Sequence, residues 1–337
     1  GEGAVVESVQ LRLEREIPIR RDVDVFIAGG GPAGVAAALA ARRQGASVYL
    51  AEGHSCFGGM GTAALVPVFL YFSDGVHFVA AGIGEEIYTR LRRETPRLYL
   101  DDPANAVGID AEALKRVYDD LMVQSGAEFT FHTHLVAVEA ERGHVKHAIC
   151  AAKSGLFAVR AKVFVDGTGD GDLAAWAGAR YAKGDEHGNL MPGSLCSVWA
   201  GIDWDAVEAH GVRQDAFLKQ AFADGVFTNH DLHLPGIFRT GRTLGTGNLV
   251  HTFGVDATDE TSLTRALIWG RKGMLEYRRY YERYLRGFEN MELATTGSLL
   301  GVRETRRIIG DYVLNVDDFR RQAVFDDEIG RYCYPVD

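Results

Sequence analysis

The chain has 337 residues and a mass of 36.8 kDa, enough for one large or two ordinary domains around a substantial core. Hydrophobic residues make up 47% and charged residues 24%, which excludes a disordered chain, a coiled coil and a small disulfide-bonded protein. The net charge of −10 argues against a nucleic-acid-binding surface. The 40 glycines exceed the usual share of about 7%, so many backbone positions need positive φ or close approach.

The cysteines and the distribution of apolar residues indicate the cellular compartment of the protein. Four widely spaced cysteines contain no C-x-x-C pair, so neither a zinc site nor a disulfide framework is indicated; they are Cys56, Cys150, Cys196 and Cys333. No apolar run approaches the ~18 residues of a membrane span, and the N-terminal residues lack the apolar segment of a signal peptide. We therefore expect a cytoplasmic protein with no membrane or nucleic-acid partner.

The first regular pattern along the chain is a strand–turn–helix–strand unit. Residues 23–28 form a short, continuous apolar run, which is typical of a strand buried on both faces. The glycine-rich segment 29–34 follows, and then an alanine-rich helical segment that Gly45 ends. A second apolar run at 47–51 completes a βαβ unit.

The rest of the chain changes character near residue 176, where segments become longer, more polar and more aromatic. In chain order we expect a glycine-rich loop at 54–76, helices at 78–94 and 110–125, a β-hairpin at 128–152, a buried strand at 161–166 and a long helix at 260–286. The fold class is therefore α/β. We predict a Rossmann-like nucleotide-binding domain at 20–175 and a mixed α+β substrate domain at 176–337.

The glycine-rich segment matches G-x-G-x-x-G between a strand and a helix. Gly29 would make the tight turn, Gly31 would let backbone N–H groups approach a pyrophosphate, and Gly34 would let helix and strand pack closely. Pro32 and Ala33 lie at the start of the helix, where the dipole and unpaired N–H groups favour a phosphate. The motif predicts dinucleotide binding, with a purely structural glycine turn as the alternative.

A carboxylate and two further glycine-rich segments narrow the choice of dinucleotide. Glu52 ends the second strand 23 residues after Gly29, about the distance expected for an acid that binds ribose hydroxyls and repels a 2′-phosphate. The segment 58–62 and the strand ending in the glycine-rich stretch 167–172 could wrap a cofactor longer than NAD. The three segments together favour FAD over NAD.

Five stretches carry a resemblance to FAD-dependent oxidoreductases of the two-dinucleotide-binding-domain flavoprotein superfamily. The closest resemblance is to a bacterial FAD-dependent oxidoreductase family that is related to fumarate-reductase-like and thiazole-synthase-like flavoproteins. The stretches are VFIAGGGPAGVAAALAARRQGASVYLAE, FGGMGT, VDGTGDGDLAAWAGA, GVDATDETSLTRA and LLGVRETRRIIGDYVLNVDD. The first is shared across the superfamily and the last is the most family-specific. The resemblance covers roughly residues 22–337.

The resemblance implies roles for residues along the whole first half of the chain. The backbone around 29–34 would hold the pyrophosphate of FAD and Glu52 the adenosine ribose. The residues expected along the ribityl-flavin side are Gly58, Gly59, Met60 and Thr62. Those expected to pair with adenine through their backbone are Leu135 or Val136, and those near the phosphates and ribitol are Thr168, Gly169 and Asp170. The activity implied is hydride transfer between an unidentified small-molecule substrate and flavin N5.

Two residues are candidates for catalysis beside the flavin. His251 lies on an expected strand of the second domain, where relatives build the substrate face, and could serve as a base; a buried structural histidine is the alternative. Arg303 could bind a substrate carboxylate or the flavin O2 region, or form a structural ion pair with Glu304. His132 and His134 alternate on a strand, but no third ligand is near in sequence and no metal is expected.

Two alternative functions remain open from the sequence. Relatives of this type continue beyond a sequence such as YCYPVD with another glycine-rich segment that contacts the isoalloxazine, and this chain ends at Asp337. The chain could therefore be a flavin-domain fragment or subunit whose site is completed by a partner chain or oligomer. The other alternative is an NAD-linked, thiazole-synthase-like enzyme, for which Glu52 also fits.

Overall fold

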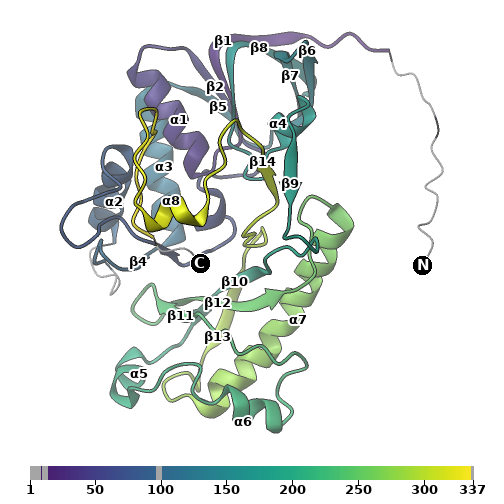
Figure 1. The fold of residues 1–337 in the computed structure, drawn as a ribbon. Coiled ribbons are helices and arrows are strands. Elements are labelled where there is room, and N and C mark those ends of the chain that lie inside the picture. The colour runs from purple at the N-terminus through teal and green to yellow at the C-terminus, as the bar shows by residue number, and fades with distance from the viewer. Residues whose placement is uncertain (1–8, 10–13, 96–100, 335–337) are drawn as a thin grey trace.

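The computed structural model describes residues 9, 14–95 and 101–334, and two main sheets organise them (Figure 1). A six-stranded sheet has the order β5-β2-β1-β8-β7-β6, and a four-stranded sheet has the order β11-β12-β10-β13. Two-stranded pairs join β14 to β9 and β3 to β4. The architecture confirms the expected α/β class.

The six-stranded sheet has a parallel half and an antiparallel half. The parallel strands are β5 (Glu128–Thr130), β2 (Val48–Ala51), β1 (Ile19–Ala28) and β8 (Gly155–Asp166). The antiparallel strands are β7 (His144–Ala152) and β6 (His134–Glu141). Because the four parallel strands run the same way, their carboxyl ends meet at one edge of the sheet, where ligands of open α/β sheets bind.

Helices α1 (Pro32–Arg43), α2 (Ile83–Glu94) and α3 (Ala111–Ser125) form a layer against the six-stranded sheet (Figure 1). The Asp110 side chain caps α3 by accepting hydrogen bonds from the N–H groups of Glu112 and Ala113, which is why this helix begins where the sequence predicts. Helix α2 begins at Ile83 rather than at the predicted residue 78.

The sequence prediction for residues 128–152 was partly wrong. Residues 128–130 do not join the hairpin but pair in parallel with β2, and the hairpin is β6–β7 alone. A turn containing His132 at φ +50° separates β5 from β6. Strand β8 begins at Gly155, earlier than predicted, and Val163 within it is 53% exposed, so this strand is not buried on both faces.

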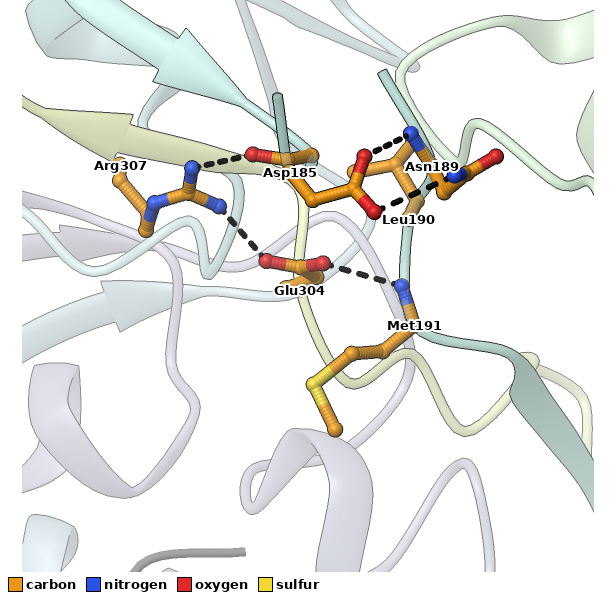
Figure 2. Close-up of a pocket in the computed structure, with 7 residues that line it drawn as sticks. Asp185, Asn189, Leu190, Met191, Glu304 and Arg307 are labelled. Carbon is orange, nitrogen blue, oxygen red and sulfur yellow. Dashed lines mark hydrogen bonds and ion pairs between the residues drawn. The ribbon is translucent and has the colours of Figure 1, made fainter. Parts of the chain in front are cut away.

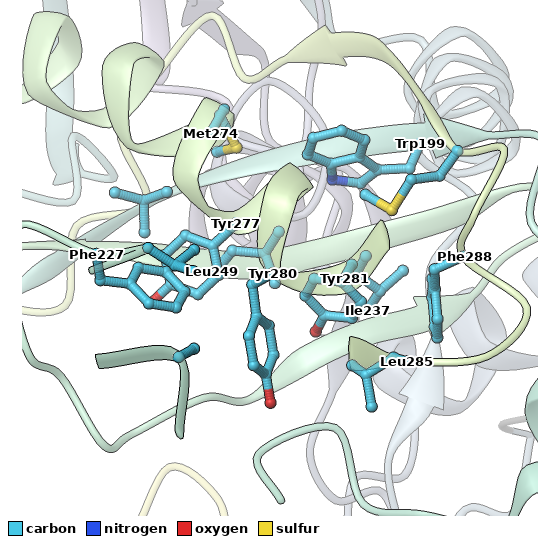
Figure 3. Packing of buried hydrophobic residues seen from close by; sticks show 14 of the residues in the cluster. Trp199, Phe227, Ile237, Leu249, Met274, Tyr277, Tyr280, Tyr281, Leu285 and Phe288 are labelled. Atoms are coloured by element: carbon cyan, nitrogen blue, oxygen red, sulfur yellow. The ribbon is translucent and has the colours of Figure 1, made fainter. Parts of the chain in front are cut away.

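The four-stranded sheet is antiparallel and is covered on one face by a long helix. Its strands are β10 (Gly193–Ala200), β11 (Gly236–Arg239), β12 (Gly245–Thr252) and β13 (Glu292–Thr296). Helix α7 (Glu260–Tyr284) packs on β10 and β12 and confirms the predicted long helix. Figure 3 shows the apolar core between them, built around Trp199, Tyr277, Tyr280, Tyr281 and Phe288.

The remaining elements connect or flank the two sheets. They are η1 (Gly59–Gly61), β3 (Val68–Phe69), β4 (Val107–Gly108), α4 (Asp172–Trp176), β9 (Tyr181–Lys183), α5 (Trp204–His210), α6 (Leu218–Ala223), β14 (Arg306–Ile308) and α8 (Val316–Arg320). None of the helices in the described ranges has the length and apolarity needed to cross a bilayer.

Two glycines set the close approach of α7 to the four-stranded sheet. A Cβ at Gly270 would lie 2.6 Å from Cβ of Leu195, and one at Gly273 would lie 2.7 Å from Cγ1 of Val250. Both neighbours belong to the buried core beneath the helix. The helix lies as close as it does because neither glycine carries a side chain.

This contact predicts a stability change opposite to the usual effect of helix propensity. Gly270→Ala gains about 1 kcal/mol of helix propensity but overpacks the core, at a cost of about 1–3 kcal/mol. We expect a lower free energy of unfolding in urea for Gly270→Ala. Gly84→Ala in α2 is the matched control, because its Cβ would make only an ordinary contact of 3.5 Å with Ala80. An equal stabilisation of both variants would contradict the packing argument.

Candidate functional site

Three glycines form the centre of the candidate site, and we call them the glycine junction: Gly29, Gly34 and Gly167. A Cβ at Gly29 would lie 2.3 Å from the Gly167 carbonyl oxygen, and one at Gly34 would lie 1.9 Å from the Gly29 carbonyl oxygen. Gly29 also has φ +91°. The junction therefore holds the end of β1, the start of α1 and the turn after β8 in direct backbone contact.

Gly31, by contrast, faces open space at the start of α1. A Cβ there would meet nothing within 4 Å among the described residues, and its φ of −68° is accessible to any residue. No side chain caps α1, Pro32 occupies the first turn with Ala33, and that turn holds no acidic residue. The first N–H groups of the helix are thus available to an anion, as a bound pyrophosphate requires.

Glu52 is buried at the carboxyl end of β2, with 7% of its surface exposed. Its Oε2 accepts a hydrogen bond from the Gly30 N–H at 2.6 Å, and its Oε1 accepts one from the His54 N–H at 2.8 Å. Each carboxylate oxygen has a second lone pair, so Glu52 retains acceptor capacity while it fixes the glycine loop.

The second glycine-rich segment lies against the first. The Gly58 N–H donates to the Gly30 carbonyl at 2.9 Å, and a Cβ on Gly59 would lie 3.4 Å from Cα of Gly31. Met60 is half-buried and its carbonyl accepts from the Val66 N–H. The hydroxyl of Thr62 is buried and donates to the Phe57 carbonyl, so this side chain shapes the loop.

The turn after β8 is organised by a carboxylate that the sequence reasoning missed. Asp166 accepts hydrogen bonds from both the N–H and the hydroxyl of Thr168, and from the N–H of Ala174. Gly169 has φ +81° and no steric neighbour within 4 Å of a Cβ among the described residues. Asp-x-Thr at the end of a strand is the local pattern that could have indicated this turn.

Asp170 connects this turn to the second half of the chain. Its carboxylate accepts a hydrogen bond from the Thr305 hydroxyl at 2.8 Å, and its carbonyl accepts from Arg306. Burial raises the pKa of Asp170, the Thr305 bond offsets part of that rise, and the neighbouring Asp172 carboxylate adds to it. The side chain thus ties the two halves of the chain together at the edge where the parallel strands end.

Leu135 and Val136 lie at the start of β6, on the outer edge of the sheet. The ladder to β7 pairs Leu135 with Cys150 and Ala137 with Ile149, so it skips Val136. Such a bulge leaves the backbone of the extra residue outside the ladder, and Val136 is 44% exposed. Of the two residues predicted to pair with adenine, Val136 has the freer backbone.

A short segment joins the edge where the parallel strands of the six-stranded sheet end to the four-stranded sheet. The Ala63 carbonyl accepts from the N–H groups of Ser298 and Leu299, and a Cβ on Gly301 would lie 3.5 Å from Val66. Gly301 in turn exchanges two backbone hydrogen bonds with Ser194 of β10, at 2.8 and 2.9 Å. Contacts therefore run without a break from the glycine loop, through residues 58–66, to the sheet that carries His251.

His251 is buried near the end of β12 and is paired with a residue that the sequence did not indicate. Its Nδ1 lies 2.5 Å from Oδ2 of Asp231, and the two side chains are 3% and 14% exposed. Burial lowers the pKa of His251, the Asp231 carboxylate opposes that effect, and the charges of Arg303 and His233 add to the lowering. Asp231 lies 20 residues away in an irregular segment, so no local pattern predicts it.

Arg303 lies close enough to His251 for its positive charge to lower the pKa of the imidazole. It acts in the same direction on the Cys196 thiol, whose pKa burial raises to about 12. The structure thus brings the two predicted catalytic residues into one electrostatic environment.

A pocket of about 420 Å³ lies next to this region, between the turn 184–191 and residues Glu304 and Arg307 (Figure 2). Its charged groups satisfy one another. Arg307 donates to Glu304 at 2.7 Å, and Glu304 accepts from the Met191 N–H. Over the described ranges, no three His, Cys, Asp or Glu side chains are grouped as a metal site would require.

The model of the family described as FAD dependent oxidoreductase matches residues 24–337. No curated protein matches the sequence. Among solved structures, the myxobacterial chondrochloren halogenase CndH is 12% identical, covering 84% of this chain and 64% of its own, with a TM-score of 0.51.

A geranylgeranyl bacteriochlorophyll reductase-like protein from Thermoplasma acidophilum is 16% identical, covering 83% of this chain and 66% of its own, with a TM-score of 0.47. The chain therefore spans about two thirds of the length of these two structures. At this identity, the likeness to CndH supports the fold alone. The family model covers nearly the whole sequence, and the chain belongs to the FAD dependent oxidoreductase family.

Proposed function

We propose that the chain binds FAD across the carboxyl ends of β2, β1 and β8 and works as an oxidoreductase on a small-molecule substrate. The observation that carries the proposal is the contrast within one glycine motif. At Gly29 and Gly34, neighbouring backbone atoms leave no room for a side chain. Gly31, by contrast, faces open space at the start of a helix that no side chain caps. A purely structural turn explains why Gly29 and Gly34 are glycines, but it does not explain the glycine at position 31, where a side chain would fit.

The residues present fit each part of the cofactor. The N–H groups at the start of α1 would hold the pyrophosphate, and Glu52 would accept hydrogen bonds from the adenosine ribose. The bulged backbone at Val136 would pair with adenine. The segment 58–62 and the turn 168–170 would line the ribityl side.

Bound FAD would supply the redox chemistry, by exchanging a hydride at N5 of the flavin. The protein's own part is to orient the substrate and to manage its proton. His251 and Arg303 are the residues we assign to these tasks, because contacts of the segment 58–66 lead from the glycine loop to the sheet beside them. A flavin subunit completed by another chain is the alternative, and FAD retention tests it.

The first test is cofactor retention by the purified chain. We expect a yellow protein whose released flavin co-elutes with FAD. Glu52→Ala removes a charged hydrogen-bond acceptor, worth about 1.5–3 kcal/mol, so the Kd for FAD should rise by about 10- to 100-fold. Glu141→Ala, an exposed carboxylate on β6, is the control and should bind FAD as the wild type does. Equal FAD affinities for the wild type, Glu52→Ala and Glu141→Ala would contradict the assignment of Glu52 to the ribose.

A second test separates binding from folding within the glycine motif. Gly31→Ala adds a methyl group in open space, so the free energy of unfolding without FAD should change by less than about 0.5 kcal/mol, while FAD affinity falls. Gly34→Ala forces a methyl group onto the Gly29 carbonyl and should destabilise the protein with or without FAD. The measurements are urea unfolding and FAD titration by fluorescence. Unchanged FAD affinity in Gly31→Ala would contradict the pyrophosphate site.

A further inference from the structure

Three buried polar atoms on the four-stranded sheet lack hydrogen-bond partners among the described residues. They are Oγ of Ser194, Oδ1 of Asn248 and Nε2 of His251. The register pairs Ser194 with His251 and Cys196 with Asn248, so all three side chains belong to neighbouring positions on β10 and β12. Buried polar groups are nearly always satisfied, so a cluster of three that are not requires an explanation.

The three side chains lie on one face of the sheet. Leu195 pairs with Val250, and both contact α7 at its glycines, which places them on the helix-covered face. Side chains alternate along a strand, so Ser194 and His251 point to the opposite face. Cys196, two residues from Ser194, lies on that face as well. Its partner Asn248 lies there too, because the ladder skips Leu249 in a bulge between Asn248 and Val250. Gly301, which contacts Val66 of the nucleotide half, pairs with Ser194 beside them.

Asp231 determines which nitrogen of His251 carries the proton. A carboxylate only accepts hydrogen bonds, so the short contact to Nδ1 requires that Nδ1 be protonated, and in the neutral imidazole the lone pair then lies on Nε2. The other oxygen of Asp231 accepts from the His233 N–H at 2.9 Å, which fixes the carboxylate itself. In this neutral form the acceptor atom of His251, Nε2, has no hydrogen-bond partner among the described residues.

We propose that Asp231 positions His251 as the proton acceptor for a polyhydroxy alcohol, which Ser194 and Asn248 bind on the same sheet face. One substrate hydroxyl donates to Nε2 and accepts from the Ser194 hydroxyl, and a second donates to Asn248 Oδ1. This rests on the proposed function, because oxidised FAD is the oxidant. As the alcohol becomes a carbonyl compound, the O–H proton passes to Nε2 and the C–H hydrogen leaves with two electrons as hydride to the flavin.

The surroundings of His251 suit this role. The charged and titratable groups that act on it are Asp231 and His233 from the segment before β11, and Arg303 from the segment after Gly301. The His233 ring stacks on His251 with centroids 5.2 Å apart, and it comes from an exposed, irregular segment. The His251 side chain is only 3% exposed, and the Phe253 ring lies edge-on to it with centroids 6.3 Å apart.

The tautomer can be measured without a substrate. In holoprotein labelled with ¹⁵N-histidine, the resonances lost in His251→Gln identify this residue. We expect neutral imidazole with Nδ1 protonated at a pH near 6.5, where an ordinary histidine is half protonated. Asp231→Asn should change the tautomer, whereas Asp205→Asn, at an exposed site, should not. A protonated Nε2 or an imidazolium in the wild type would overturn the proposal.

The substrate class is tested by anaerobic reduction of the bound flavin with a panel of polyols and their monodeoxy counterparts. We expect polyols to bleach the flavin, with His251→Gln slower by about 10²–10⁴-fold and Asp231→Asn also slower, at unchanged FAD content. Ser194→Ala and Asn248→Ala should weaken polyol binding. Asp205→Asn should match the wild type.

Each failure points to a different part of the argument. If the flavin of His251→Gln bleaches as fast as that of the wild type, the roles of His251 and Asp231 are overturned. If no polyol bleaches the flavin, the substrate class is overturned. Wild-type protein that retains no FAD would overturn the proposed function instead, and the tautomer measurement on the apoprotein would still decide the role of Asp231.

Discussion

The backbone contact among Gly29, Gly34 and Gly167 is the constraint on which the candidate site depends. A single methyl group at any of the three would lie within 3 Å of a carbonyl oxygen. The contact fixes the start of α1 against the ends of β1 and β8, so the helix dipole, the Glu52 carboxylate and the turn after β8 all converge on one edge.

A second constraint couples this edge to the four-stranded sheet. The segment 58–66 contacts the glycine loop at one end and Gly301 at the other, and the Asp170–Thr305 hydrogen bond joins the two halves nearby. All of these are short contacts between backbone or small side chains, which tolerate little displacement. Rigid placement of this kind is what orients a substrate toward a cofactor, since small errors in geometry cost large factors in rate.

The sequence predicted what depends on local patterns. The βαβ unit, the helix capped by Asp110 and the long helix α7 follow from hydrophobic periodicity and end signals. Residues 128–130 were assigned to the hairpin because alternation alone cannot tell a parallel partner from an antiparallel one. The glycine motif, Glu52 and the Asp-x-Thr pattern of the Asp166 turn are local signals of the same kind, whereas the hydrogen bond from the Ala174 N–H to Asp166 spans eight residues and has no such pattern.

Asp231 shows why the surroundings of His251 were harder to predict than the glycine motif. Asp231 meets His251 through a contact that spans 20 residues, and it lies in an irregular segment outside any helix or strand. Residue type alone suggests His251 as a candidate. It cannot predict the tautomer of His251, because the tautomer depends on which ring nitrogen contacts a carboxylate. The unpartnered atoms of Ser194 and Asn248 are likewise properties of strand register. Local sequence patterns therefore indicate the backbone turns around the glycine motif, whereas a contact between side chains 20 residues apart, such as that of Asp231 with His251, has no such pattern.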